Sequence, residues 1–439
     1  MNDERRQVGH CAHATLPRHG VADSLCAPPP CVRAAARAAS PNGPWTCLEA
    51  LEPRLLLAGE DVLTILNPVP GANDHFGSAI AAVGADMIVV GATDDDEAAL
   101  DAGAAYVFDR DSGGLLHTLL SPAPASGDQF GFAVAAVGQD KVLIGAPRDD
   151  TQRVDGGAAY LFDLLTDEVV HSFFSPDPQP RASFGSAVAG AGDGKLLIGA
   201  YNHDLAIPDV GAAFLFDALT GDVLQTLMNP TPTRGDQFGF AVAEIDATTV
   251  AVGAPGKNAG ATNTGAAYLF DSATGTLQRT LANPTPDASD SFGYAMSRIG
   301  ANQLLVIAPN ESSTAPFAGA AYLFNTGSGN VVHTFDNPAP NDLDFFGRSV
   351  AAGGGSSLLI GAASDDSAAD NAGAAYLFDA GSGTLTAAFL DPNPDSSDQF
   401  GFAAADAGSE RLAISANNDN SGAVNAGAVY IVDTQLPPP

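Results

Sequence analysis

The chain has 439 residues, 45% of them hydrophobic, and carries 51 Asp and Glu against 18 Lys and Arg, for a net charge of −33. Such an acidic surface repels nucleic acid and anionic lipid, and it lacks the basic side chains that displace phosphate counterions. These features exclude a nucleic-acid partner, and no apolar run is long enough to predict a membrane span.

Residues 1–60 differ in composition from the rest of the chain. They hold all four cysteines (Cys11, Cys26, Cys31 and Cys47), whose spacing fits no zinc site, so the body must be stable without disulfides. Arg and acidic residues balance in this segment, so the negative charge belongs to residues 61–439. We interpret 1–60 as a disordered or processed leader, and residues 435–439 as a Pro-rich tail.

Residues 61–70 read DVLTILNPVP and align without a gap with VLQTLMNPTP at 223–232. The later segment is the end of a repeat, so the earlier one is a single strand separated from its repeat. The last repeat stops at Val432, one strand short of the others. We therefore predict that residues 61–66 supply its missing strand, through Val62, Leu63, Ile65 and Leu66.

Residues 61–434 contain seven copies of a 54-residue unit without insertion or deletion. A Phe-Gly pair opens each copy, and a Gly-Ala-Ala or Gly-Ala-Val marker follows it at a constant distance. A period near 50 residues is typical of propellers and arrays. The structural pairs are Phe76 and Gly77, Phe130 and Gly131, Phe184 and Gly185, Phe238 and Gly239, Phe292 and Gly293, Phe346 and Gly347, and Phe400 and Gly401.

Each copy contains four short apolar segments rich in β-branched and aromatic residues, separated by Gly, Asp, Asn and Pro. In one copy these are FGFAVAAV, KVLIGA, GAAYLF and DEVVHSFF. Four antiparallel strands repeated seven times predict an all-β fold, a seven-bladed β-propeller of four-stranded antiparallel blades. The ring would be closed by the N-terminal strand that completes the last blade. We expect the Phe to fill the space between sheets and the Gly to permit close approach near the central channel.

Two connections of each copy should emerge on one face: the loop after the second strand and the Pro-containing loop after the fourth. The richest acidic loops there supply candidate ligand or cation sites, since Ca²⁺ prefers carboxylate and carbonyl oxygens. The alternative is a solvated face whose Asp residues form turns. The candidates are Asp94, Asp95, Asp96, Asp101, Asp149, Asp150, Asp155, Asp365, Asp366 and Asp370.

The Phe-Gly pairs and the IGAP and VGAP segments at 144–147 and 252–255 resemble FG-GAP repeats, which build the propeller head of integrin α chains and many bacterial surface proteins. The resemblance covers residues 61–434 and implies an extracellular recognition or adhesion module. The integrin-type calcium cage between the first and second strands has no counterpart here. Residues 51–57 resemble the LEPR-XLL motif at the N-termini of exported bacterial proteins, which implies export to the cell surface or beyond.

We therefore expect a monomeric, non-catalytic module that binds a protein or carbohydrate through the acidic loop face, with Ca²⁺ as a candidate cofactor. A structural spacer of a cell envelope or matrix is the alternative, and a hydrolase at the channel mouth is a more distant one. His117, His171 and His333 share one repeat position on the predicted outermost strand, where we expect solvated side chains. No nucleophile with a partner base is legible, so no catalytic residue is assigned.

Overall fold

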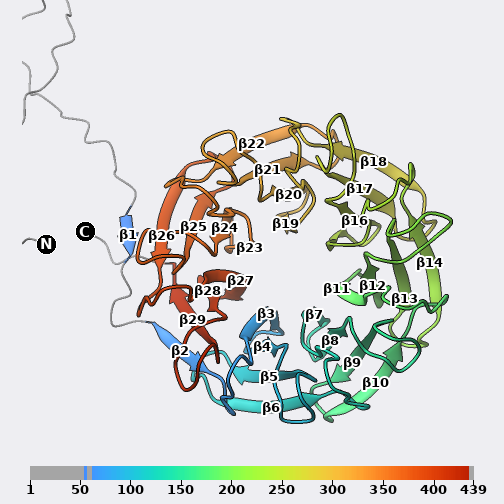
Figure 1. Cartoon of the computed structure of the whole chain (residues 1–439), viewed down its shortest axis with the longest axis horizontal. Coiled ribbons are helices and arrows are strands. Elements are labelled where there is room, and N and C mark those ends of the chain that lie inside the picture. Colours follow the sequence, from blue (N-terminus) through green and yellow to red (C-terminus); the bar gives the residue numbers. More distant parts are fainter. Residues whose placement is uncertain (1–53, 57–61, 435–439) are drawn as a thin grey trace, which may run out of the picture. The chain divides into compact units, whose positions relative to one another are not determined.

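The computed structural model describes residues 54–56 and 62–434. Within them, seven sheets stand as blades around a central axis (Figure 1), which confirms the predicted seven-bladed β-propeller. The strands of the first six blades run in chain order from the axis outward. No helix of the described part is long and apolar enough to cross a membrane.

The second and third strands of every blade are six residues long, whereas the first strand varies from four to nine residues. The blades are, in chain order, β3 (Phe76–Val83), β4 (Met87–Ala92), β5 (Ala104–Asp109) and β6 (Leu115–Leu120); β7 (Ala133–Val137), β8 (Lys141–Ala146), β9 (Ala158–Asp163) and β10 (Glu168–Phe173); β11 (Phe184–Gly190), β12 (Lys195–Ala200), β13 (Ala212–Asp217) and β14 (Val223–Met228); β15 (Val242–Asp246), β16 (Thr249–Ala254), β17 (Ala266–Asp271) and β18 (Leu277–Ala282); β19 (Met296–Ile299), β20 (Gln303–Ala308), β21 (Ala320–Asn325) and β22 (Val331–Asp336); β23 (Ser349–Ala352), β24 (Ser357–Ala362), β25 (Ala374–Asp379) and β26 (Leu385–Leu390); and β27 (Phe400–Gly408), β28 (Arg411–Ala416) and β29 (Ala428–Asp433).

The seventh blade is completed by β2 (Leu63–Leu66), drawn in blue beside the red β29 in Figure 1. The two strands pair antiparallel, with Ile65 opposite Val429. Ile65 is buried, Leu63 packs partly into the same cluster, and Leu66 is exposed. The predicted ring closure is thus confirmed for the described residues, with Ile65 as its main apolar contact.

The hydrophobic core lies between blades. Among the described residues, seven clusters of buried side chains each join two neighbouring blades. One of them joins the last blade (β27–β29) to the first (β3–β5). The second and third strands of each blade are covered on both faces, which explains their nearly continuous apolar sequences. Each Phe of the Phe-Gly pairs is fully buried, and Phe130 packs within 5.9 Å of Tyr160 between ring centroids.

The Phe-Gly pairs also join the backbones of neighbouring blades. The Phe130 amide donates to the Ala102 carbonyl of the preceding blade at 2.8 Å. A Cβ on Gly103 would lie 2.1 Å from the Phe130 oxygen. A Cβ on Gly131 would lie 2.3 Å from the Ala104 oxygen. The close approach expected near the channel is therefore a joint between adjacent blades.

Two further features differ from the sequence-based expectation or lie beyond it. The position shared by His117, His171 and His333 is partly exposed, and its side chains also make contacts between blades. His171 Nε2 lies 2.7 Å from the Leu219 carbonyl, and His117 Nδ1 lies 2.5 Å from Asp167.

The backbone of β1 (Arg54–Leu56), within the leader motif, pairs parallel with β26 as a fifth strand. The rest of the predicted leader (1–53, 57–60), residue 61 and the tail 435–439 lie outside the described residues.

Candidate functional site

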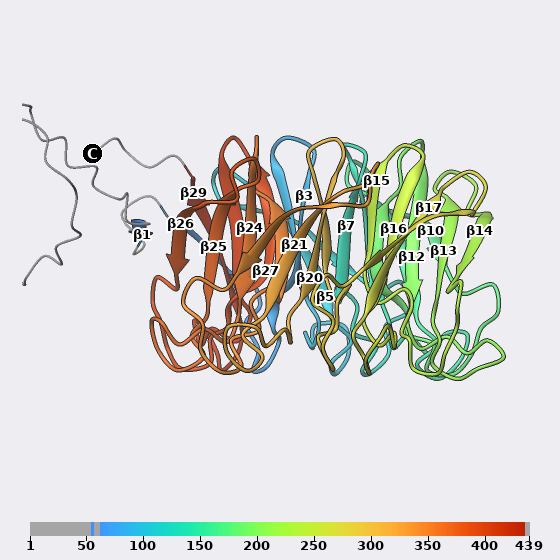
Figure 2. The same ribbon diagram turned by 90° about the horizontal axis from the view of Figure 1, so that it is seen from above.

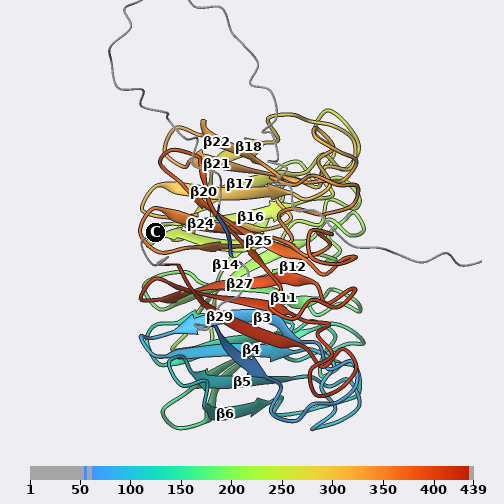
Figure 3. The same ribbon diagram turned by 90° about the vertical axis from the view of Figure 1, so that its left-hand side faces the viewer.

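The long connections of every blade lie on one side of the ring, as predicted (Figures 2 and 3). Strands one and three begin on this side, so the loops before them meet there, while the short hairpin turns lie on the opposite side. We call this side the loop face. It carries all ten acidic candidates predicted from sequence.

Three of these candidates are buried in their loops. Asp95, Asp149 and Asp365 are at most 2% exposed. Each accepts a hydrogen bond from a tyrosine hydroxyl and one from the backbone amide two residues later. For Asp95 these donors are Tyr106 at 2.7 Å and the Glu97 amide at 2.8 Å. These carboxylates hold the loop against the third strand.

Asp96, Asp150 and Asp366 lie at the loop surface and close the loop. Each accepts the backbone amide of the residue five positions later, at 2.7 Å in all three loops. Asp101 and Asp155 supply two of these amides, and Asp370 lies beside the third. The ten candidates are spread over three blades, and the one compact three-carboxylate group among the described residues contains none of them. Ligand binding by these loops stays a prediction.

A pocket of about 590 Å³ lies at the mouth of the central channel on the loop face. Its wall comes largely from one repeat position, two residues after each Phe of the Phe-Gly pairs. The seven side chains at this position are Ser78, Phe132, Ser186, Phe240, Tyr294, Arg348 and Phe402. The repeated scaffold therefore presents one side chain from each blade to one shared space, and these seven side chains are of four residue types.

The pocket combines aromatic rings with one cation. The Arg348 guanidinium carbon lies 3.9 Å from the centroid of the Phe402 ring and 5.7 Å from that of Tyr294. The Phe240 ring is next to Tyr294, with centroids 4.8 Å apart. In the described part of the chain no carboxylate forms an ion pair with Arg348. A cation over aromatic faces can bind the carboxylate of a partly apolar ligand.

Asp94 is the acidic candidate that reaches this pocket. Its carboxylate contacts His75 Nδ1 at 2.7 Å and accepts Gln129 Nε2 at 3.1 Å. Burial acts to raise the pKa of Asp94, but these hydrogen bonds and the charge of His75 outweigh it and lower that pKa. Ser78 donates to the His75 carbonyl at 2.6 Å rather than to its ring, so these groups do not form a nucleophile–base–acid chain.

A second repeated arrangement was not predicted. Four repeat positions meet in each gap between blades, and in six of the seven gaps all four are polar; we call the side chains at these positions the junction cluster. In the first copy these are Asn67, Asp74, Asp95 and Tyr106. Asn67 donates to Asp74 at 2.7 Å, and Tyr106 donates to Asp95 at 2.7 Å. Asp74 and its equivalent Asp128 also accept a backbone amide in the turn before each Phe.

The composition of the junction cluster changes around the ring. At the Asp95 position the seven copies have Asp95, Asp149, His203, Lys257, Glu311, Asp365 and Asp419. Lys257 brings its own cation, with Nζ 3.2 Å from Asp236. Where His203 replaces the acid, Phe214 replaces the tyrosine and Ala182 the first Asp. Comparing the internal copies column by column would have revealed this coupled variation.

The junction clusters predict an unusual pH dependence. Burial, then the charge of a neighbouring carboxylate, raises the pKa of Glu311 to about 7, and burial raises those of Asp128 and Asp344 to about 6. Near pH 5 the folded chain thus holds protons that the unfolded chain has lost. The free energy of unfolding falls with rising pH wherever the folded state binds more protons than the unfolded state. We therefore expect the melting temperature to drop by several degrees between about pH 5 and pH 8.

Thermal unfolding followed by circular dichroism over this range, with chelator present, measures the effect. Carboxylates of lowered pKa, such as Asp379 in a hairpin turn, change stability only at lower pH. Burial lowers the pKa of His203, which opposes the trend in this range, but His203 is one group against three carboxyl groups of raised pKa. Glu311→Gln should reduce the change in melting temperature between pH 5 and pH 8. A melting temperature that rises from pH 5 to pH 8 would contradict the assignment.

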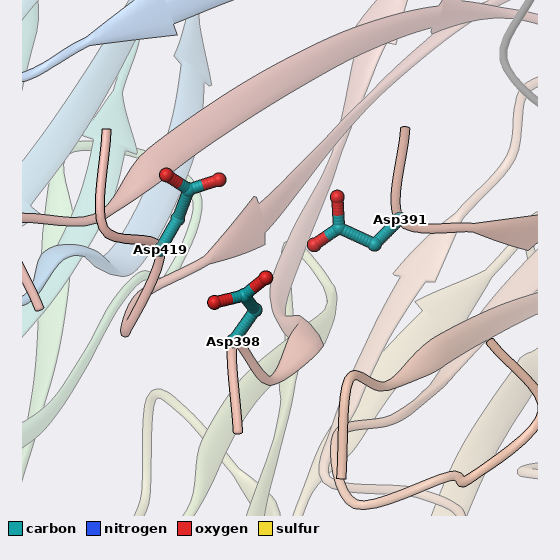
Figure 4. Close-up of side chains that lie close together, drawn as sticks. All are labelled: Asp391, Asp398 and Asp419. Atoms are coloured by element: carbon teal, nitrogen blue, oxygen red, sulfur yellow. The ribbon is translucent and has the colours of Figure 1, made fainter. Parts of the chain in front are cut away.

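The last junction cluster has three carboxylates, from Asp391, Asp398 and Asp419 (Figure 4). Asp391 stands where the first copy has Asn67, so the amide donor is replaced by a third acid. This is the described group whose donor set could hold a metal ion. Neither Asp391 nor its partners were among the predicted site residues.

The family described as FG-GAP repeat matches residues 64–108, 117–162, 170–216, 225–270 and 340–378, which together make up about half of the chain. No curated protein sequence matches the chain significantly. Many solved structures share the ring fold. One, described as the crystal structure of the mitotic checkpoint complex, is 13% identical, with a TM-score of 0.57 over 91% of this chain and 98% of that chain. At this identity the likeness concerns the fold alone.

Proposed function

This chain belongs to the FG-GAP repeat family, and we propose that it is an exported, non-catalytic recognition module that binds its ligand at the channel mouth of the loop face. The observation that carries the proposal is Arg348, a cation without a carboxylate partner among the described residues, stacked on aromatic rings in the channel-mouth pocket of a strongly acidic chain. The resemblance of residues 51–57 to an export motif supports the location outside the cell.

The chemistry of the pocket narrows the ligand to a class. Phe402, Phe240 and Tyr294 offer apolar faces, and Arg348 offers a fork of donors to a planar anion. The acidic loops around the mouth repel a highly charged polyanion. We therefore propose a saccharide or peptide group with one apolar face and a single carboxylate. The acidic loops then act as an outer rim that selects against other anions.

The binding test compares ligands in pairs that differ only in the carboxylate, such as a uronate oligosaccharide and its neutral hexose counterpart. We expect the acidic member to bind and Arg348→Gln to weaken it about tenfold or more, because a charge-assisted hydrogen bond contributes about 1.5–3 kcal/mol. Titration calorimetry measures both. The matched control is Arg234→Gln, an exposed loop-face arginine outside the pocket, which should leave the affinity unchanged.

If the ligand with a carboxylate and its neutral counterpart bound equally well, the proposal that Arg348 binds a carboxylate would be contradicted. If no saccharide or peptide pair bound at all, the structural-spacer alternative would be favoured. The hydrolase alternative depends on the His75–Asp94 contact at the mouth. It predicts turnover of chromogenic esters or glycosides that His75→Ala abolishes, whereas a recognition module shows no turnover.

A further inference from the structure

We propose that the junction cluster formed by Asp391, Asp398 and Asp419 is a Ca²⁺ site that ties the sixth blade to the seventh. Asp391 follows β26, Asp398 precedes β27, and Asp419 lies in the loop after β28 (Figure 4). The three side chains are at most 3% exposed. One oxygen from each lies within 4.8 Å of the others. That spacing suits oxygens placed around one Ca²⁺ at about 2.4 Å each.

Two of the buried oxygens have no partner. Asp391 Oδ1 accepts the Asn393 amide at 2.8 Å and Asp398 Oδ2 accepts the Asp395 amide at 2.6 Å, but Asp391 Oδ2 and Asp398 Oδ1 accept nothing. Figure 4 shows the Asp391 and Asp398 carboxyl groups turned toward each other. A buried charged oxygen without a hydrogen bond is costly, and a cation removes that cost for several oxygens together.

The unpaired oxygen that is specific to the last copy is Asp391 Oδ2, since the counterpart of Asp398 Oδ1 also lacks a partner in Asp128 and Asp344. The other copies show how the position of Asp391 is satisfied without an ion. Four of them have asparagine in place of Asp391 (Asn67, Asn229, Asn283 and Asn337), and each amide donates to the neighbouring Asp at 2.7 Å. The fourth copy also has a lysine, Lys257, at the repeat position of Asp419. Its ammonium group lies 3.2 Å from Asp236. The repeat thus accommodates a positive charge at this place, and the last copy alone among the seven has three acids and no internal cation.

The donor set indicates the kind of ion. All three side chains offer oxygen, which suits a hard cation and not zinc. A polar cavity of about 110 Å³ adjoins the cluster, and the side chains of Asn393, Asp395 and Asn420 line it together with Asp398 and Asp419. It offers a route for the ion and room for the carbonyl or water oxygens that complete a Ca²⁺ shell.

The test is thermal unfolding of the full chain in Ca²⁺, in Mg²⁺ and in chelator. We expect about 1 mM Ca²⁺ to raise the melting temperature by about 5 °C over chelator, with a smaller effect of Mg²⁺. Asp391→Asn should abolish the Ca²⁺ shift while still folding, because it restores the asparagine of the other copies. Terbium, a luminescent substitute for Ca²⁺, should be sensitised by Tyr430, whose hydroxyl lies 2.7 Å from Asp419, and lose that signal in the variant.

The matched control is Asp150→Asn, which removes the same charge from the loop face. Asn258 and Asn420 stand at the same repeat position and make the same loop-closing hydrogen bond, so this variant should fold and keep the full Ca²⁺ shift. The inference would be overturned by a melting temperature that is equal in Ca²⁺ and chelator, by a larger Mg²⁺ effect, or by loss of the shift in Asp150→Asn but not in Asp391→Asn.

Discussion

Deletion of residues 61–70 is expected to lower the free energy of unfolding by about 5 kcal/mol or more, which approaches the whole stability of a typical domain. The deletion removes β2 from β29, along with all four of its residue pairs. It exposes the cluster around Val429 and Ile431 that Ile65 covers. It also leaves Asp74 without the amide of Asn67.

The unpaired edge of β29 should have a second effect. An exposed apolar strand with free amides and carbonyls pairs readily with other chains, so the deletion variant should aggregate. Calorimetry and light scattering measure the two effects together. A deletion variant that melted like the parent and stayed monomeric would show that the ring is closed by something other than β2.

Two single substitutions separate ring closure from a general effect on folding. Ile65→Ala should cost about 2–5 kcal/mol because its side chain is 2% exposed. Leu66→Ala, one residue later on the same strand, should cost less than about 1 kcal/mol because that side chain is 44% exposed. Equal costs at the two positions would contradict the packing described for β2.

The fold was predictable from sequence because the repeat has no insertions. A constant spacing from Phe76 to Phe400 determines the number of blades, and the stray copy of a fourth strand at 61–70 identifies the closure. Strand starts were less predictable. In the second blade the first strand begins at Ala133 rather than at Phe130, whereas in the third it begins at Phe184, although the glycine after the Phe has the same positive φ in both blades.

The site was harder to predict from the sequence than the fold, because its contacts form between residues that the curvature of the ring brings together. Asp391, Asp398 and Asp419 are each ordinary members of their repeat, and only the comparison with Asn67 and its equivalents shows that one donor is missing. The pocket at the channel mouth collects one side chain from each blade, Arg348 among them. Each of them follows a Phe-Gly pair, but the sequence does not show that side chains 54 positions apart meet in one space.

Gly131→Ala is expected to destabilise the chain by about 2–5 kcal/mol, the sum of about 1–2 kcal/mol for the left-handed backbone and about 1–3 kcal/mol for overpacking. Gly131 has a φ of 91°, which an L side chain adopts only with strain. The new Cβ would also lie 2.3 Å from the Ala104 oxygen and 3.2 Å from the Gly91 Cα of the preceding blade. Both neighbours are backbone atoms of buried residues, so neither can move without opening the joint between blades.

Gly127→Ala, four residues earlier, separates the two causes. Gly127 has a φ of 84°, so the substitution introduces similar backbone strain, but nothing lies within 4 Å of its Cβ. It should therefore cost only about 1–2 kcal/mol, the penalty of the left-handed conformation itself. Chemical denaturation of both variants measures the difference. If the two costs were equal, the Phe-Gly glycine would be needed for its turn alone, and the contact between backbones would not be what joins one blade to the next.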